Sequence, residues 1–108
     1  MAAVYSSLLA SIVNAPVGNT DLGGPAPGHV WVVKSIDVVR RSGILVPAGG
    51  FEVMDTNSEP LFSRYFPWSY PRYTHSWWGA QVILPPSGLR FVAAELNWSA
   101  RISGYDLV

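Results

Sequence analysis

The sequence predicts an all-β protein, a small antiparallel β-sandwich that is jelly-roll-like and has an extended N-terminal arm. Short runs rich in Val, Ile and aromatic residues are separated by turns rich in Pro and Gly, which is typical of sandwiches and small barrels. No segment shows the 3.6-residue apolar period of an amphipathic helix. The length of 108 residues fits one domain.

The first 24 residues are predicted to form an N-terminal arm, or a first strand plus a loop, ahead of a sandwich domain at residues 25–108. Residues 1–13 are apolar but lack the basic start of a signal peptide and are too short to span a membrane. An uncharged tail is explained equally well by contact with a partner or by pairing within its own sandwich. The candidate arm contacts are Val4, Leu8, Leu9, Ile12 and Val13. Residues 14–28 are expected to form a loop.

Three turns share a Pro-x-x-Gly frame, at residues 25–28, 47–50 and 85–88, and a strand-like run follows each of them. Residues 77–84 and 89–95 flank the last of these turns, so we expect them to form a hairpin. Further short strands are expected at residues 51–54 and 61–65.

The run from His29 to Arg41 is rich in Val and Ile and apolar on both faces, which indicates a central strand. Regular alternation would place one set of side chains on one face (Val30, Val32, Ile36, Val38) and a second set on the other (Trp31, Val33, Val39).

The C-terminal run has the clearest period of two: Leu96, Trp98, Ala100 and Ile102 alternate with polar residues. We therefore expect Trp98 and Ile102 to point inward, near Val30, Val32 and Phe91. Gly104 interrupts this alternation and indicates a bulge.

Charged residues are scarce, at 13% of the chain against roughly 25% in an average soluble domain. The seven basic and seven acidic residues give no net charge and form no basic stripe, which argues against nucleic-acid binding. Low charge and neutrality favour association, so we expect much of the surface to be covered in an assembly. The absence of cysteine excludes disulfides and thiol chemistry.

No catalytic motif stands out, and we expect a non-enzymatic protein without cofactor or metal. His29 and His75 are far apart in sequence, lack metal-ligand spacing, and are expected at turns or on the surface. The Gly-x-Ser-x-Gly motif is missing. Asp55 and Glu59 could serve as a glycosidase pair only in a deep cleft, which a domain of this size rarely encloses.

The most distinctive feature is the aromatic segment, residues 65–78, with Arg64 just before it. Aromatic rings with polar groups, together with arginine, dominate protein interfaces and can also stack on sugars. Alternatively, several of these rings cover an open end of the core. The candidate interface or ligand-binding residues are Arg64, Tyr65, Phe66, Trp68, Tyr70, Arg72, Tyr73 and Trp77.

Three runs resemble a family of small virion proteins of tailed bacteriophages: residues 25–33 (PAPGHVWVV), 78–88 (WGAQVILPPSG) and 98–105 (WSARISGY). The similarity covers most of the chain after residue 25. It implies a β-sandwich structural protein of the virion, in the tail tip, as a minor tail protein or as a capsid decoration.

The expected partners are copies of the chain itself, in a trimer or another symmetric homo-oligomer, and other virion proteins. No nucleic acid and no membrane insertion are expected. The alternative function is a receptor- or carbohydrate-binding module that uses the aromatic segment on a host surface glycan.

Overall fold

The computed structural model describes residues 7–40, 46–69 and 73–108, apart from the side chains of residues 46, 68 and 69. Eight strands form in this part of the chain: β1 (Ser7–Ile12), β2 (Gly18–Gly23), β3 (Val30–Arg40), β4 (Val46–Asp55), β5 (Pro60–Ser69), β6 (Tyr73–Ile83), β7 (Leu89–Ala93) and β8 (Trp98–Leu107). The described residues contain no helix, so none could span a membrane.

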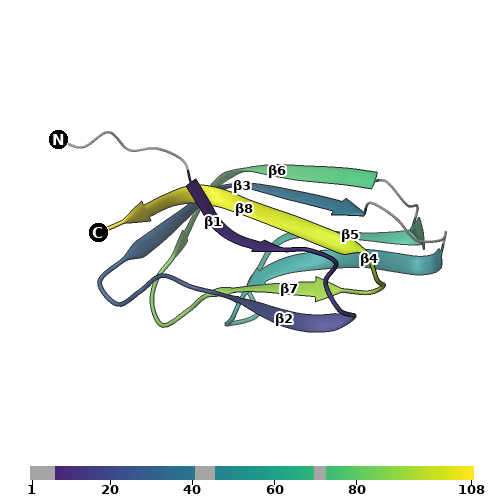
Figure 1. The fold of residues 1–108 in the computed structure, drawn as a ribbon, viewed down its shortest axis with the longest axis horizontal. Coiled ribbons are helices and arrows are strands. Elements are labelled where there is room, and N and C mark those ends of the chain that lie inside the picture. The colour runs from purple at the N-terminus through teal and green to yellow at the C-terminus, as the bar shows by residue number, and fades with distance from the viewer. Residues whose placement is uncertain (1–6, 41–45, 70–72) are drawn as a thin grey trace.

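The strands form two four-stranded antiparallel sheets, which lie as two layers in Figure 1. Sheet A has the order β1-β8-β3-β6, and sheet B has the order β2-β7-β4-β5. The first strand pairs with the last, the second with the seventh, the third with the sixth and the fourth with the fifth. This nested pairing, distributed alternately over two sheets, is a jelly roll. The predicted fold class is confirmed.

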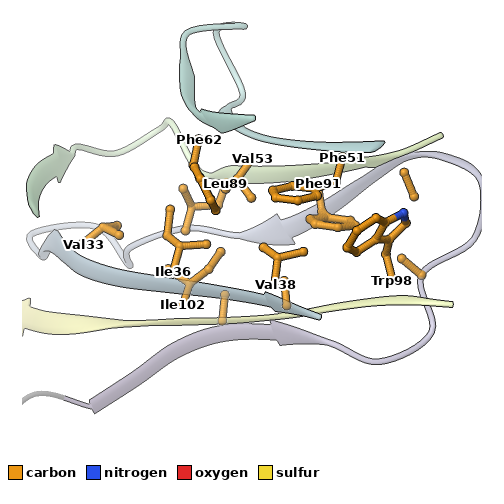
Figure 2. Close-up of a cluster of buried hydrophobic side chains, with 14 of the residues drawn as sticks. Val33, Ile36, Val38, Phe51, Val53, Phe62, Leu89, Phe91, Trp98 and Ile102 are labelled. Carbon is orange, nitrogen blue, oxygen red and sulfur yellow. The ribbon is translucent and has the colours of Figure 1, made fainter. Parts of the chain in front are cut away.

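The core lies between the two sheets, as Figure 2 shows. Sheet A contributes Ile36 and Ile102, and sheet B contributes Phe51, Phe91 and other apolar side chains. Trp98 is fully buried, and its ring lies 5.0 Å from that of Phe51. Its indole N–H donates a hydrogen bond of 2.7 Å to Glu95, so the polar group of this large ring is satisfied. The inward placement of Trp98, Ile102 and Phe91 is as expected.

The inward face of β3 changes at Lys34, and the expected faces of this strand were wrong. Trp31 and Val33 are buried before this point, whereas Ile36 and Val38 are buried after it. The pairing register of β3 with both neighbours shifts between Val33 and Ser35. One extra residue in a strand reverses the orientation of all residues that follow. Val30 and Val32 are therefore only partly buried and do not join the core near Trp98.

Gly104 lies in β8 directly opposite this bulge. A Cβ atom at Gly104 would collide with the carbonyl oxygen of Val32 and would lie 3.0 Å from the backbone nitrogen of Lys34. The glycine therefore permits the close approach of the two backbones where β3 bulges. The predicted interruption of the alternation at Gly104 was wrong, because the alternation of β8 continues through this residue and the extra residue is in β3, opposite the glycine.

The described part of the N-terminal segment belongs to the sandwich. Residues 7–12 pair with β8, and residues 18–23 pair with β7, so the alternative of a first strand holds here. Leu9 and Ile12 are partly buried and pack against the chain's own core, as expected for a first strand. Leu8 and Val13 are exposed, and Val4 lies outside the described residues. The loop expected over residues 14–28 is wrong at β2.

Two local predictions about turns were also wrong. The strands on either side of residues 85–88 lie in different sheets, so β6 and β7 do not form a hairpin. The turn carries the chain from one layer to the other, as jelly-roll connections do. Residues 47–50 do not form a turn but lie within β4, where Pro47, Gly49 and Gly50 pair with β5.

Candidate interaction surfaces

The aromatic segment occupies β5 and β6, which are edge strands of opposite sheets. Its inward rings meet across the opening between these edges. Phe66 of β5 lies 5.1 Å from His75 and 6.1 Å from Tyr73, both on β6, measured between ring centroids. Trp77 also packs against the core. These four rings therefore cover the open side of the sandwich, which is the core-covering role considered for the segment.

His75 is part of this ring cluster and is neither in a turn nor on the open surface, so that expectation was wrong. The imidazole stacks on Tyr73 with centroids 4.5 Å apart, and it also contacts Phe51 and Phe66. Its Nε2 atom is buried without a hydrogen-bond partner among the described residues. Burial, and to a lesser extent the nearby charge of Arg64, lower the pKa of His75. The ring therefore favours its neutral form.

Two aromatic side chains point outward, on opposite sheets. Tyr65 is 61% exposed on sheet B, and its hydroxyl donates a 2.7 Å hydrogen bond to Glu52. Partial burial and this bond to a carboxylate raise the pKa of Tyr65 to about 12. Trp78 is 74% exposed on sheet A. Because they lie on different layers, these two rings form no common platform.

Of the remaining candidate residues, one is exposed and the other three lie wholly or partly outside the residues that the structure describes. Arg64 is exposed, and its guanidinium lies 4.8 Å from the Phe62 ring centroid. The backbone of Trp68 pairs with Pro47, but its side chain is not described. Tyr70 and Arg72 lie outside the described residues.

An apolar surface that the sequence analysis did not identify runs across the outer face of sheet A. The strand registers place Tyr105, Val32 and Val82 side by side on β8, β3 and β6. On one side of these three residues, Trp78 of β6 pairs with Ser35 of β3. On the other side, Val30 of β3 pairs with Leu107 of β8. We call these residues the sheet A stripe: Val30, Val32, Trp78, Val82, Tyr105 and Leu107. The bulge at Lys34 creates this stripe, because it turns Val30 and Val32 outward.

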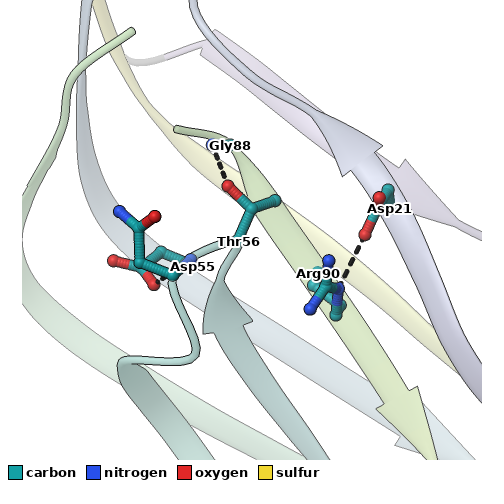
Figure 3. Close-up of polar contacts among 6 residues, drawn as sticks. Asp21, Asp55, Thr56, Gly88 and Arg90 are labelled. Carbon is teal, nitrogen blue, oxygen red and sulfur yellow. Dashed lines mark hydrogen bonds and ion pairs between the residues drawn. The ribbon is translucent and has the colours of Figure 1, made fainter. Parts of the chain in front are cut away.

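The carboxylates near the β4–β5 turn serve local structure. Asp55 accepts hydrogen bonds of 2.9 Å from the backbone N–H groups of Asn57 and Glu59, so it holds the turn and does not form an acid–base pair with Glu59. Beside the turn, Thr56 accepts a hydrogen bond from the Gly88 N–H, and Asp21 pairs with Arg90 at 2.7 Å (Figure 3).

A shallow polar hollow of about 230 Å³ lies at the same end of the sandwich, lined by residues of β2 and of the segments around Thr56 and Ser87. Its only carboxylate is the one that Arg90 already binds. In the described part of the chain, no cluster of three or more His, Cys, Asp or Glu residues could hold a metal ion.

Two charged residues that contact the core, the partly buried Glu95 and the buried Arg40, were missed by the sequence analysis. Glu95 accepts hydrogen bonds from the Trp98 indole and from the Gly50 N–H, at 2.7 and 2.9 Å. Arg40 is buried, and its Nε donates to the carbonyl of Leu96 at 3.3 Å. Both residues fix the segment between β7 and β8 against the core, which is a structural role. No local sequence pattern signals either of them.

Comparisons of the chain with protein-family models, with curated proteins and with solved structures find no match.

Proposed function

We propose that this chain is a non-enzymatic structural protein of a bacteriophage particle, either a tail-tip or minor tail subunit or a capsid-decoration subunit, that assembles through exposed apolar and aromatic surfaces. The observation that carries the proposal is the sheet A stripe. Soluble monomers rarely expose a continuous apolar surface of this kind, and such surfaces mark interaction sites. The low charge of the chain favours the same conclusion.

The location of the virion-like motifs adds support. The run at residues 25–33 leads into β3, the run at 78–88 contains the second half of β6, and the run at 98–105 forms most of β8. These three strands are neighbours in sheet A and carry the stripe. Jelly rolls occur in viral capsid proteins, although the fold is also found in lectins and enzymes and does not determine function alone.

The test is to purify phage particles produced by the genome that encodes this chain. We expect mass spectrometry to detect the chain in the particles, and electron microscopy with a specific antibody to place it on the tail or capsid. Particles that are complete without the chain would refute a structural role. A parallel screen of the purified chain for hydrolytic activity is expected to remain negative.

Carbohydrate binding is the second candidate, and Tyr65 is the observation that favours it. Its exposed ring is held in place by the hydrogen bond to Glu52, whose second oxygen could accept a bond from a sugar hydroxyl. A glycan array distinguishes this function: binding that is lost in Tyr65→Ala and retained in Trp78→Ala would support a receptor-binding module.

A further inference from the structure

The four edge strands of the sandwich differ in how well they resist pairing with another chain. Proteins protect free edges with charged side chains, prolines, bulges or short strands. In sheet B, β5 contains Pro60, Arg64 and Pro67, and the six-residue β2 contains Asp21 and a register shift before Gly23. Both edges of sheet B are therefore protected.

The edges of sheet A have no charged residue. The strand β1 is only six residues long and has a register shift at Leu9, which shortens its regular part. In contrast, β6 has 11 residues with neither charge nor proline, and within the described residues it pairs only with β3. Its register with β3 is regular from Tyr73 to Trp78, before Gly79 and Ala80 interrupt it opposite Lys34.

Exposed apolar side chains lie directly beside this edge. Trp78 and Val82 are outward-facing residues of β6 itself, with 74% and 51% of their surface exposed. Val32 and Tyr105 extend the same surface across the sheet. With an aromatic side chain able to bury about 150–250 Å², the stripe offers on the order of several hundred Å² to a partner.

We propose that β6 is the interface strand and that its partner is β6 of a second copy, paired antiparallel about a two-fold axis. This inference rests on the assembly role proposed above and names its contact surface. The two sheets A then form one continuous eight-stranded sheet. Backbone hydrogen bonds along about 20 Å of the regular part of β6 hold the pair together, and Trp78, the stripe residue closest to the axis, covers the seam from each copy.

Charge and alternation both favour a second copy as the occupant. A two-fold axis brings identical residues together, so a charged strand would face its own charge, whereas β6 itself has none. The carboxylate beside the axis is that of Asp37 on β3, and it accepts a 2.7 Å hydrogen bond from Ser76. Antiparallel partners must share a face, and Thr74, Ser76 and Trp78 share the outer face of sheet A. A two-fold axis at Ser76 therefore places Thr74 of one copy beside Trp78 of the other.

Sedimentation equilibrium of the full chain and of two lysine variants provides the first test. The wild-type chain of 11.8 kDa is expected to sediment as a dimer. Trp78→Lys should raise the dimer dissociation constant about 30-fold or more, as expected for loss of an interface hot spot with added like charge. Tyr65→Lys is the matched control, because it places the same charge at an exposed aromatic position on the edge of sheet B. A wild-type monomer at about 100 µM, a trimer, or equal weakening by both variants would overturn the proposal.

Cysteine cross-linking provides a test that does not depend on the folding of a lysine variant. The chain has no cysteine, so a single introduced thiol can react only with its copy in a second molecule. Ser76→Cys should form a covalent dimer rapidly on oxidation, because the two thiols meet at the two-fold axis. Asn19→Cys on the exposed edge of β2 should not. Equal cross-linking of the two variants would overturn the pairing.

The outcomes also separate this inference from the proposed function. A chain that is monomeric in solution but present in particles overturns β6 pairing and leaves the structural role intact. A chain that dimerises through β6 but is absent from particles supports the pairing and refutes the structural role.

Discussion

Sheets A and B contribute similarly to the core but differ on their outer faces and edges. The outer face of sheet B carries polar pairs, Asp21 with Arg90 and Glu52 with Tyr65, and both of its edges contain charged residues. The outer face of sheet A carries the apolar stripe at one end and the polar residues Asp37, Ser76 and Arg101 at the other, and neither of its edges has a charge.

The difference between the two outer faces bears on function. A sandwich needs apolar residues on the inner faces of both sheets, so those positions say little about function. The outer faces are free to be polar, and an outer face that remains apolar indicates contact with another molecule. Two of the four tryptophans of sheet A show the contrast, because Trp98 is fully buried and Trp78 is mostly exposed.

The largest effect on stability is expected from Trp98. Replacement by Ala removes a ring that contacts Phe51 and His75 and leaves Glu95 without its indole partner. We expect Trp98→Ala to lower the free energy of unfolding by about 3–5 kcal/mol, measured by urea denaturation. A loss below about 1 kcal/mol would show that this ring is not part of the shared core.

The second prediction concerns the bulge that makes sheet A different. Gly104→Ala adds a methyl group where the backbone of β3 approaches most closely, so β8 or β3 must shift. We expect a loss of about 1–3 kcal/mol in unfolding free energy. Ser103→Ala, one residue away on the outer face, is the control and should change stability by less than about 0.5 kcal/mol. Equal effects of the two changes would contradict the close approach.

The fold class could be predicted from local sequence patterns, but the bulges and strand partners that depend on pairing between distant strands could not. The alternation in β8 is uninterrupted through Gly104, so its inward residues were identified correctly. In β3 the same reasoning failed, because the bulge at Lys34 depends on pairing with β8 and β6. The strand β2 is polar and rich in glycine, and it becomes a strand through its pairing with β7.

The candidate surfaces show the same division. Residue types located the aromatic segment, but only the assignment of β5 and β6 to opposite sheets separates Phe66, which packs against the core, from the outward Tyr65. Tyr73 contacts Phe66 but remains 47% exposed. The sheet A stripe draws residues from three strands that are distant in sequence. Its central members, Val32 and Val82, come into register only through the jelly-roll topology.

The third prediction is a pH dependence that comes from His75. Its pKa in the folded chain is lowered from 6.5, so the unfolded chain binds the proton more readily. The contribution of the neutral His75 to stability is therefore fully present above about pH 6.5, and it is lost as the pH falls from there toward the folded-state pKa. Arg64 faces the ring from β5, and Tyr73 and Phe66 also contact it.

The pH test compares the wild-type chain with His75→Phe, which keeps an aromatic ring in the cluster and removes the titrating group. Urea denaturation at pH 7.5 and 5.5 should show a smaller loss of stability in the variant. An identical pH dependence in the two chains would exclude His75 as the source.

The smallest effect on folding is expected at Trp78, and it provides the clearest contrast with Trp98. In a single copy Trp78 is 74% exposed, so Trp78→Ser should change the free energy of unfolding by no more than about 0.5 kcal/mol. This holds only when the chain is too dilute to associate. At higher concentrations a partner that binds the folded state stabilises the wild-type chain by mass action, and the weakened variant gains less. The difference in melting temperature between the wild-type chain and Trp78→Ser should therefore grow with concentration. Thermal unfolding at about 1 µM and at about 200 µM measures it. If Trp78→Ser is already much less stable than the wild-type chain at about 1 µM, Trp78 contributes to the fold of the single chain. If the two chains have similar stabilities at both concentrations, the exposed surface of sheet A does not bind a second copy.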